Sequence, residues 1–245
     1  MLIANQLSVA LGGKPIIEDV SFSLKRGERL AIIGPNGSGK TTLLKTLAGL
    51  LPATGQLTYD AMDIRTYNPK QRAKLIGLMN QKPTTFFDHT VYDVVMMGRY
   101  VHAGTLSAQK EDEHIKSILE LTGLSNHMYT PLSQLSGGMV QKVYLSAVIA
   151  QDTSIILLDE FTNHLDITSQ INIIKFLKSF ARDKILIGVF HDINVAMQMS
   201  DRLLLLDKGK VVIDAPYSQV LPLLNTTYQF NLSEFMISSL RKWDS

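Results

Sequence analysis

Alternating apolar and polar residues near the start of the chain predict β-structure. Val20, Phe22 and Leu24 alternate with Ser21 and Ser23, and this period of two is typical of a strand with one buried face. Other short apolar runs bounded by turn residues predict strands at 29–33, 56–59 and 74–79. We therefore expect the first part of the chain to consist largely of strands.

A helical spacing of apolar residues appears further along. Leu43, Leu44 and Leu47 recur at the intervals of one helix face. The same spacing predicts several helices between about residues 84 and 150, one of them over 111–121. We therefore expect a largely helical segment in the middle of the chain.

The remainder of the chain mixes the two patterns. Apolar runs at 155–158 and 184–190 are typical of buried parallel strands. Residues 168–180 have helical spacing, and residues 203–213 predict a hairpin around Lys208-Gly209. Because strands alternate with helices, we expect an α/β fold with a mostly parallel sheet and a helical insert.

Composition narrows the classes of function. The 245 residues include 24 basic and 22 acidic side chains, a net charge of +2, so bulk charge gives no reason to expect nucleic acid. The chain has no cysteine, which excludes disulfides and thiolate chemistry. No run approaches the length of a membrane span, and the N-terminus lacks the pattern of a secretory signal. With 45% hydrophobic and 19% charged residues, either the core is large or a partner covers part of the surface.

A glycine-rich segment links the predicted strand 29–33 to the helix that follows. It has the spacing Gly34-x-x-x-x-Gly39-Lys40-Thr41, which is the phosphate-binding loop pattern in its strand–loop–helix context. Glycines let the backbone N–H groups approach phosphate oxygens, and the helix N-terminus adds its positive end. Lys40 can reach the β- and γ-phosphates and Thr41 can bind Mg²⁺. The alternative, a plain glycine-rich turn, does not explain the Lys and Thr.

Two carboxylates stand at the end of the apolar run 155–158. Asp159 can hold Mg²⁺, directly or through water, and Glu160 can orient or deprotonate an attacking water. The carboxyl end of a strand is where α/β sheets bind ligands. A strand that simply leaves the core would have the same pattern, so the pair alone decides nothing.

Two further segments allow both a structural and a functional interpretation. Ser136, Gly137 and Gly138 precede a helical pattern, where they would form an anion site or an ordinary helix cap. His191 follows the strand 184–190, where it would touch a γ-phosphate or serve only the structure.

Taken together and in order, these motifs resemble the ATP-binding subunit of an ABC transporter. The phosphate loop Gly34–Thr42, Gln81, Leu135–Gly138, Ile155–Glu160, Asn163–Asp166 and His191 match that family's sequence of motifs up to about residue 220. The resemblance implies a P-loop NTPase core over about 1–83 and 151–220, with an N-terminal antiparallel β part. It also implies a helical subdomain over about 84–150 and a C-terminal tail over about 221–245.

The resemblance also implies a mechanism and a set of roles. Two copies pair head to tail, and each ATP lies between the phosphate loop of one copy and the family's signature motif, here Leu135–Gly138, of the other copy. ATP closes this dimer and hydrolysis opens it, which drives a membrane partner. In this arrangement Gln81 senses Mg²⁺ and Asp166 connects the two sites. The implied catalytic residues are Glu160, His191 and Gln81; the implied metal ligands are Thr41, Gln81 and Asp159; the implied nucleotide-binding residues are Gly34, Pro35, Asn36, Gly37, Ser38, Gly39, Lys40, Thr41, Thr42, Ser136, Gly137, Gly138 and Asp166.

A narrower resemblance concerns the cargo. The segments 90–102, 163–170 and 191–196 are similar to those of importers of iron–siderophore, haem and cobalamin. This implies permease partners, an indirect substrate-binding protein, a place at the cytoplasmic face of the membrane, and no nucleic acid. The apolar residues 94–97 would either hold a coupling helix of the permease or merely pack the insert.

Three departures from the family's pattern leave alternatives open. Leu11 stands where an aromatic residue normally stacks on adenine, Met139 follows the signature in place of a polar residue, and Phe161 replaces a proline. The first weakens the expected preference for ATP over GTP. None removes a ligand of phosphate, metal or water, so we expect a functioning ATPase. The alternatives are a soluble ABC-type ATPase acting on DNA or ribosomes, and a regulatory ATP-binding module with impaired hydrolysis.

Overall fold

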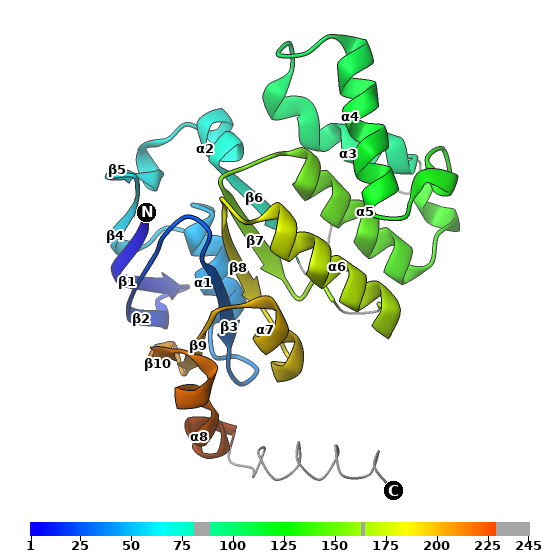
Figure 1. The fold of residues 1–245 in the computed structure, drawn as a ribbon. Helices are drawn as coiled ribbons and strands as arrows, with labels where there is room; N and C mark the ends of the chain where they lie inside the picture. The colour runs from blue at the N-terminus through cyan, green and yellow to red at the C-terminus, as the bar shows by residue number, and fades with distance from the viewer. Residues whose placement is uncertain (81–88, 163–164, 229–245) are drawn as a thin grey trace, which may run out of the picture. The chain divides into compact units, whose positions relative to one another are not determined.

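The structure of the chain is a computed structural model (Figure 1), which describes residues 1–80, 89–162 and 165–228. The chain forms two compact units. The first contains Met1–Asp63 and the described residues from Gly188 to Tyr228, and the second contains the described residues within Ile64–Ile187. No helix of the described residues is both long and apolar enough to cross a membrane.

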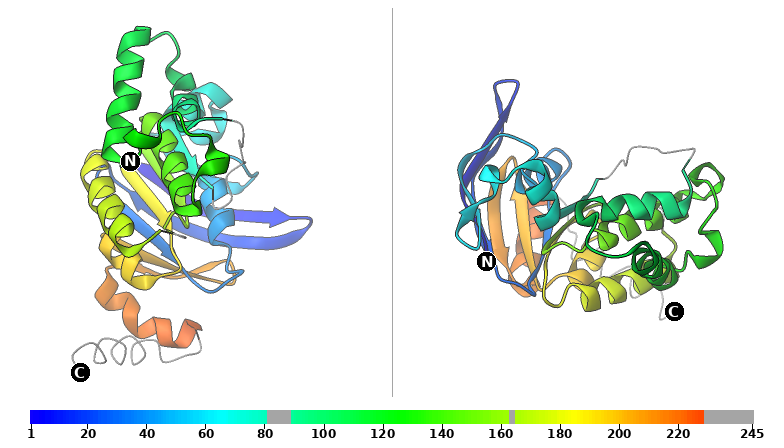
Figure 2. Two further views of the ribbon diagram at one scale, coloured as in Figure 1. Left: turned by 90° about the vertical axis from the view of Figure 1, so that its right-hand side faces the viewer. Right: turned by 90° about the horizontal axis from the view of Figure 1, so that it is seen from above.

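The first unit begins with a four-stranded antiparallel sheet. Its strands, in spatial order, are β2 (Lys14–Leu24), β1 (Leu2–Leu11), β4 (Thr54–Tyr59) and β5 (Met62–Asp63). In this sheet Leu2 pairs with Leu24 on one side and with Tyr59 on the other, and these three side chains are buried. Figure 2 shows β1 and β2 as a long hairpin in blue.

The same unit contains a second group of strands, which leads to the phosphate loop. β3 (Arg29–Ile33) pairs in parallel with β9 (Arg202–Asp207), and β9 pairs antiparallel with β10 (Lys210–Ala215). The side chains of residues 30–33 are fully buried, as expected for a strand covered on both faces. The helices of this unit are α1 (Lys40–Leu47), α7 (Ile193–Met199) and α8 (Tyr217–Tyr228).

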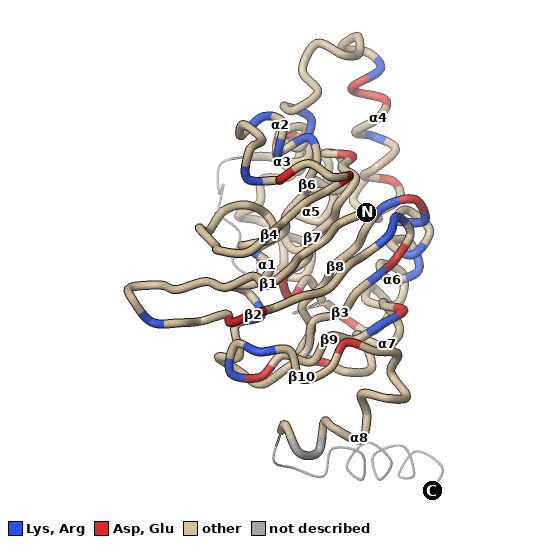
Figure 3. The backbone as a smooth tube through the Cα atoms, turned by 90° about the vertical axis from the view of Figure 1, so that its left-hand side faces the viewer, with Lys and Arg blue, Asp and Glu red and all other residues tan. Residues whose placement is uncertain are grey.

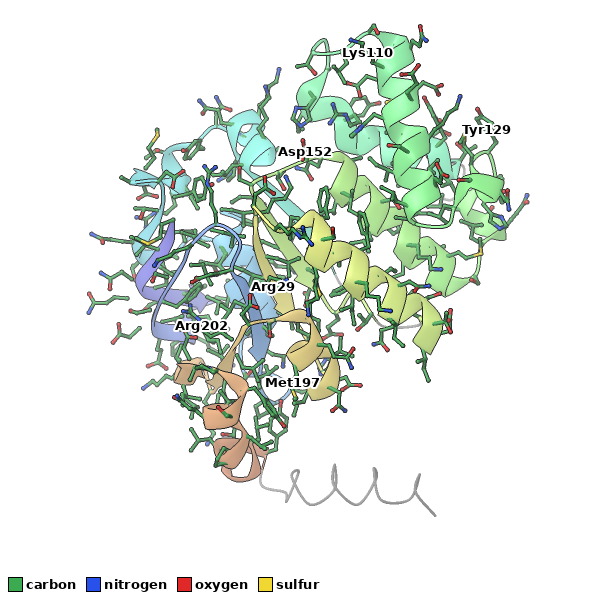
Figure 4. All side chains as sticks on the ribbon, viewed as in Figure 1. Arg29, Lys110, Tyr129, Asp152, Met197 and Arg202 are labelled. Carbon is green, nitrogen blue, oxygen red and sulfur yellow. The ribbon has the colours of Figure 1, made fainter. Side chains whose placement is uncertain are left out.

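Ion pairs fix two of these strands where they begin. The Arg29 guanidinium lies 2.6 Å from Asp201, and Arg202 lies 2.8 Å from Asp214 on β10. Both arginines are labelled in Figure 4. Burial raises the pKa of Asp214, while the positive charge of Arg202 opposes that rise.

The second unit contains the central helices and a short pair of parallel strands. β6 (Ile76–Met79) pairs with β7 (Ile155–Asp159), so that Met79 lies opposite Leu158. β8 (Ile185–Val189) runs from this unit into the first. The helices are α2 (Pro69–Leu75), α3 (Val91–Gly98), α4 (Ala108–Leu121), α5 (Gly137–Ala150) and α6 (Ile167–Phe180), with 3-10 turns at Ile64–Thr66, Arg99–His102, Ser125–His127 and Leu132–Gln134.

Close packing of α3 on α5 explains two residues of the central segment. A Cβ atom at Gly98 would clash with the carbonyl oxygen of Ala147, so only glycine permits this approach. Arg99, which is 8% exposed, bonds Glu111 on α4 at 2.8 Å and the carbonyl oxygen of Ala150 at 2.9 Å. The hydrogen bond from Arg99 lowers the pKa of Glu111. The rest of α4 carries charged residues along its length (Figure 3).

The predicted α/β class and parallel strands are confirmed, and so is the helical character of the central segment. The strand predicted over 74–79 begins only at Ile76, because α2 occupies the residues before it. The start of that helix is encoded by a capping box in which Asn68 and Gln71 bond each other's backbone. The pattern analysis did not predict α2, α7 or α8.

Candidate functional site

The phosphate loop joins β3 to α1 in the first unit. Gly34, Gly37 and Gly39 all have positive φ angles, of 151°, 78° and 103°. A Cβ atom at Gly34 would clash with the carbonyl oxygen of Leu206, and one at Gly39 would lie 2.6 Å from Ile17 Cδ1. The loop therefore needs glycine at both ends, because neighbouring strands pack directly against its backbone.

The N-terminus of α1 is shaped to receive an anion. Gly39 is its N-cap and no side chain caps the helix, so no side-chain acceptor competes for the first N–H groups. Lys40 is 6% exposed, and its Nζ donates to the carbonyl oxygens of Gly34 at 2.8 Å and Pro35 at 2.9 Å. The ammonium is therefore held inside the loop that should bind phosphate. Thr41 and Thr42 follow in the first turn, both half-buried.

A cavity of about 520 Å³ adjoins this loop. It is lined by Pro35, Asn36, Gly37, Ser38, Asp207, Lys208, Thr227 and Tyr228. The last two residues belong to α8, which sequence analysis did not connect with the site. The apolar residues of α8 recur at helical intervals and could have revealed the helix, but no sequence pattern links its end to the loop.

His191 also belongs to the first unit, where it is exposed just after β8. The preceding residue, Phe190, donates its N–H to the carbonyl oxygen of Ile32 in β3 at 3.2 Å. Since β3 ends at Ile33, the histidine and the phosphate loop leave the ends of neighbouring strands. His191 therefore follows a strand that lies beside the strand leading to the phosphate loop.

The two carboxylates lie at the end of β7 in the second unit. Asp159 is 1% exposed and Glu160 is 7% exposed. Glu160 has a φ of 51°, a strained backbone conformation for a residue with a side chain. Strain of this kind is tolerated where the surrounding structure enforces it, and it is common at functional sites. Gln81 lies outside the described residues, two positions after the end of β6.

The signature residues form the start of α5 in the second unit. The Ser136 hydroxyl accepts a hydrogen bond from Met139 N at 3.4 Å, so it caps the helix. Ser136 and Gly137 are exposed, and a Cβ atom at Gly137 would meet no other atom within 4 Å. Ser136 therefore caps the helix, as the structural interpretation expects, and the open space at Gly137 also leaves room for a ligand.

Asp166 is the N-cap of α6 and is exposed. It accepts hydrogen bonds from Ser169 N at 2.9 Å and Ser169 Oγ at 2.6 Å. These bonds, the one from the hydroxyl first, lower the pKa of the Asp166 carboxyl. Within one chain, the residue thus serves to start a helix. Asn163 and His164 lie outside the described residues.

The three departures from the family's pattern have different surroundings. Leu11 is the last residue of β1, and its side chain is 41% exposed. Met139 is half-buried in the first turn of α5. Phe161 is 0% exposed, and this burial anchors the backbone directly after Glu160 in place of a proline.

An apolar cavity of about 280 Å³ lies beside α3 in the second unit. It is lined by Leu78, Met79, Asn80, Val94, Met97, Gly98, Tyr144, Ala147, Val148 and Gln151. Of the residues 94–97 considered for permease contact, Val95 is 0% exposed and only packs the unit. Met97 lines the cavity and is half-buried, so the docking interpretation is retained for it.

Each unit has an oxygen donor of the kind that Mg²⁺ prefers. In the first unit this donor is the Thr41 hydroxyl, and in the second unit it is the Asp159 carboxylate. Among the described residues no three His, Asp or Glu side chains form a metal cluster. Mg²⁺ is commonly bound through one or two protein groups together with substrate phosphates, and a hydroxyl and a carboxylate are suitable groups.

Comparison with known proteins identifies the family. Residues 17–163 match the ABC transporter family. The chain is 38% identical over 216 residues to the ferric enterobactin transport ATP-binding protein of Escherichia coli, covering 86% of this chain and 80% of that protein. It is 33% identical over 220 residues to the hemin import ATP-binding protein of Vibrio anguillarum, covering 87% and 84%.

A solved structure shows the same fold. It is an ATP-binding cassette in a dimeric post-hydrolysis state bound to ADP and Pi, with a TM-score of 0.81 and 26% identity, covering 88% of this chain and 98% of that one. This likeness confirms the predicted ABC ATPase fold. The chain belongs to the ABC transporter family.

Proposed function

We propose that this chain is the ATP-binding and hydrolysing subunit of an importer that takes up a metal chelate through a partner permease. The chelate would belong to the iron–siderophore, haem or cobalamin class. The observation that carries this proposal is the likeness, over most of the chain, to proteins named for ferric enterobactin transport and hemin import.

The chain is an ABC-type ATPase, and its own residues suggest how it acts on ATP. The loop Gly34–Thr42 binds the phosphates through backbone N–H groups and Lys40. Glu160 orients and deprotonates the attacking water, and His191 contacts the γ-phosphate. Thr41, Asp159 and Gln81 would hold Mg²⁺, which neutralises phosphate charge when it is bound.

A second copy of the chain would complete each site. Ser136, Gly137 and Gly138 would contact the nucleotide held by the partner copy's phosphate loop, and Asp166 would link the two sites. Two observations support this: the signature is exposed with open space at Gly137, and a related cassette is dimeric. The dimer would close with ATP and open after hydrolysis.

The permease would dock on the second unit. The cavity beside α3 is mostly apolar and includes the flexible side chain of Met97, which suits contact with an inserted helix. Docking there would place the chain at the cytoplasmic face of the membrane, with a substrate-binding protein acting on the far side.

The proposed function also includes a division of the chain into parts. These are a core of about 1–83 and 151–220, a helical subdomain of about 84–150 and a tail of about 221–245.

Uptake of radioactive iron tests the proposal. Cells lacking the gene should fail to take up iron supplied as a siderophore complex or as haem, and the native chain should restore uptake. The Glu160→Gln variant should not restore it. Unchanged uptake of metal chelates, together with co-purification with ribosomes, would show the soluble alternative to be right. If the purified chain binds ATP but the assembled transporter does not hydrolyse it, the regulatory ATP-binding module would be favoured.

A further inference from the structure

The helix α5 ends at a junction of four elements of the second unit. Its C-cap, Gln151, donates its side-chain N–H groups to the carbonyl oxygens of Ala73 in α2 at 2.6 Å and Ile76 in β6 at 3.2 Å. The carbonyl oxygen of Gln151 accepts a hydrogen bond from His102 Nε2 at 2.8 Å, since a carbonyl can only accept. One residue therefore joins α5 to α2, to β6 and to the turn that follows α3.

These bonds satisfy backbone groups that have no partner in their own elements. Ala73 lies in the last turn of α2, where the carbonyl oxygens have no intrahelical donor. Ile76 is the first residue of β6. A carboxamide has two N–H donors on one nitrogen, so Gln151 can bond both carbonyls at once. An apolar side chain of the same length could bond neither.

The backbone on both sides of Gln151 is also held in place. Arg99 donates to the carbonyl oxygen of Ala150 at 2.9 Å, and Lys184 donates to Asp152 at 2.9 Å. Asp152, which is labelled in Figure 4, has a φ of 47°, so the chain turns sharply as it leaves the helix. Displacement of this helix end from β6 would therefore break several hydrogen bonds together.

The two ends of α5 face different tasks. Residues 137–138 of the signature form its first turn, and the helix continues over 14 residues, a length of about 21 Å. At the other end, Gln151 lines the apolar cavity together with Met79 of β6 and Met97 of α3. A contact made in the cavity and a contact made at the signature thus act on the same helix.

We propose that Gln151 is a positioning residue that couples permease contact to the signature. Its side chain holds the end of α5 to β6, so that a permease segment bound in the cavity moves the strand and the signature helix together. This inference rests on the proposed importer function and on docking of the permease beside α3. Gln151 lies outside every motif considered above, and it acts through α5 and β6 rather than on the nucleotide.

The alternative is that Gln151 only ends its helix and stabilises the fold. Gln151→Met keeps the length of the side chain and removes both donors, so it lowers stability under either interpretation. Ser146→Ala is the matched control, because Ser146 lies on the same helix and is 0% exposed. Its hydroxyl is bonded to Thr122 Oγ1 at 3.0 Å, which ties α5 to the end of α4 instead of to β6.

The test compares ATP turnover of the assembled transporter with that of the purified chain alone. Assembly with the permease should raise turnover of the native chain, and Gln151→Met should reduce this ratio about three- to tenfold, the loss typical of one hydrogen bond. Ser146→Ala should keep the native ratio, and the permease should co-purify with both variants. A native ratio in Gln151→Met would overturn the proposal. Loss of the permease from that variant would also overturn it, because the residue would then serve docking.

A second variant tests the same junction without changing Gln151. His102→Phe keeps an aromatic ring and removes the bond to the Gln151 carbonyl, so the ratio should fall about twofold, the lower end of coupling effects. If Gln151→Met does not fold, a native ratio in His102→Phe would refute the inference alone. A native chain whose turnover does not change on assembly with the permease would refute the proposed importer function as well.

Discussion

Two helices begin at the residues that the motifs assign to phosphate, and they begin in different ways. The start of α1 has a glycine N-cap with no side-chain cap, and buried Lys40 is bonded to the loop before it. The start of α5 is exposed, and its N-cap Ser136 bonds the helix's own Met139 N–H. The first N–H groups of α1 have no side-chain acceptor and can bind a ligand. At the start of α5 the helix's own N-cap, Ser136, already accepts a hydrogen bond from Met139 N–H.

This difference indicates which part of the nucleotide site a single copy of the chain can form. Strands of the same unit pack directly against Gly34 and Gly39 at the two ends of the phosphate loop, so the shape of that loop is fixed by its own chain. Nothing of this kind surrounds Gly137, where the space is open. The phosphate loop should therefore respond to changes within one copy. Substitutions in the signature, residues 136–138, should change activity only in assays in which two copies of the chain form a dimer.

The largest expected effect is that of Gly34→Ala. The added methyl group would clash with the Leu206 carbonyl at a φ of 151°, so we expect more than about 2 kcal/mol of lost stability and no ATP binding. Urea unfolding and nucleotide titration measure the two losses. In Gly137→Ala, the control, the methyl group enters open space near the start of α5, and stability should stay within about 1 kcal/mol of the native value. Normal ATP binding by Gly34→Ala would contradict the packing argument.

The next effect separates chemistry from binding. Glu160→Gln should lower ATP turnover by about 10²- to 10⁴-fold, the usual contribution of a general base. ATP affinity should be nearly unchanged, because the phosphate loop is intact. Glu113→Gln on α4 is the control, since that carboxylate is exposed and its bond to Gln109 at 3.1 Å is local. If Glu160→Gln hydrolysed ATP at the native rate in the assembled transporter, another group would be the base.

A smaller change should improve the site. Leu11→Tyr would provide the aromatic ring that the end of β1 lacks, and stacking on a base is worth about 1–3 kcal/mol in nucleic-acid-binding proteins. We expect tighter ATP binding and a higher ratio of ATP to GTP affinity. Leu50→Tyr, at a position 57% exposed just after α1, is the control for added aromatic surface. An unchanged ratio of ATP to GTP affinity would mean that the purine ring of the nucleotide does not lie beside residue 11.

The sequence predicted well those parts whose signals are local. Periodicity placed the strands 29–33 and 155–158 and the helix over 111–121, because burial on one or both faces dictates the pattern. The phosphate loop was recognisable because its spacing reflects backbone contact with phosphate. The start of α2 also has a local signal in Asn68 and Gln71, which the apolar pattern does not contain.

What the sequence could not predict depends on contacts between distant residues. Tyr228 lines one cavity with residues 35–38 of the phosphate loop, although the two segments are far apart in the sequence, and the packing of α8 on β9 and β10 brings them together. The buried bond between Arg99 and Glu111 is likewise invisible to periodicity. Whether Ser136 is a cap or a ligand is ambiguous for another reason: the same exposed hydroxyl can do both.

The smallest expected effect resolves that ambiguity, and the chain provides a close control for it. Ser107 caps α4 with an N–H···O distance of 3.4 Å, the same as for Ser136 on α5, and both serines are exposed. Ser136→Ala and Ser107→Ala should each cost about 1 kcal/mol of stability through loss of the cap. Only Ser136→Ala should also slow ATP turnover at concentrations where the chain forms dimers, because only that hydroxyl would face a second copy's nucleotide. Equal turnover in the two variants would mean that Ser136 only caps α5. The starts of α1 and α5 would then differ in structure, but they would not bind the same nucleotide.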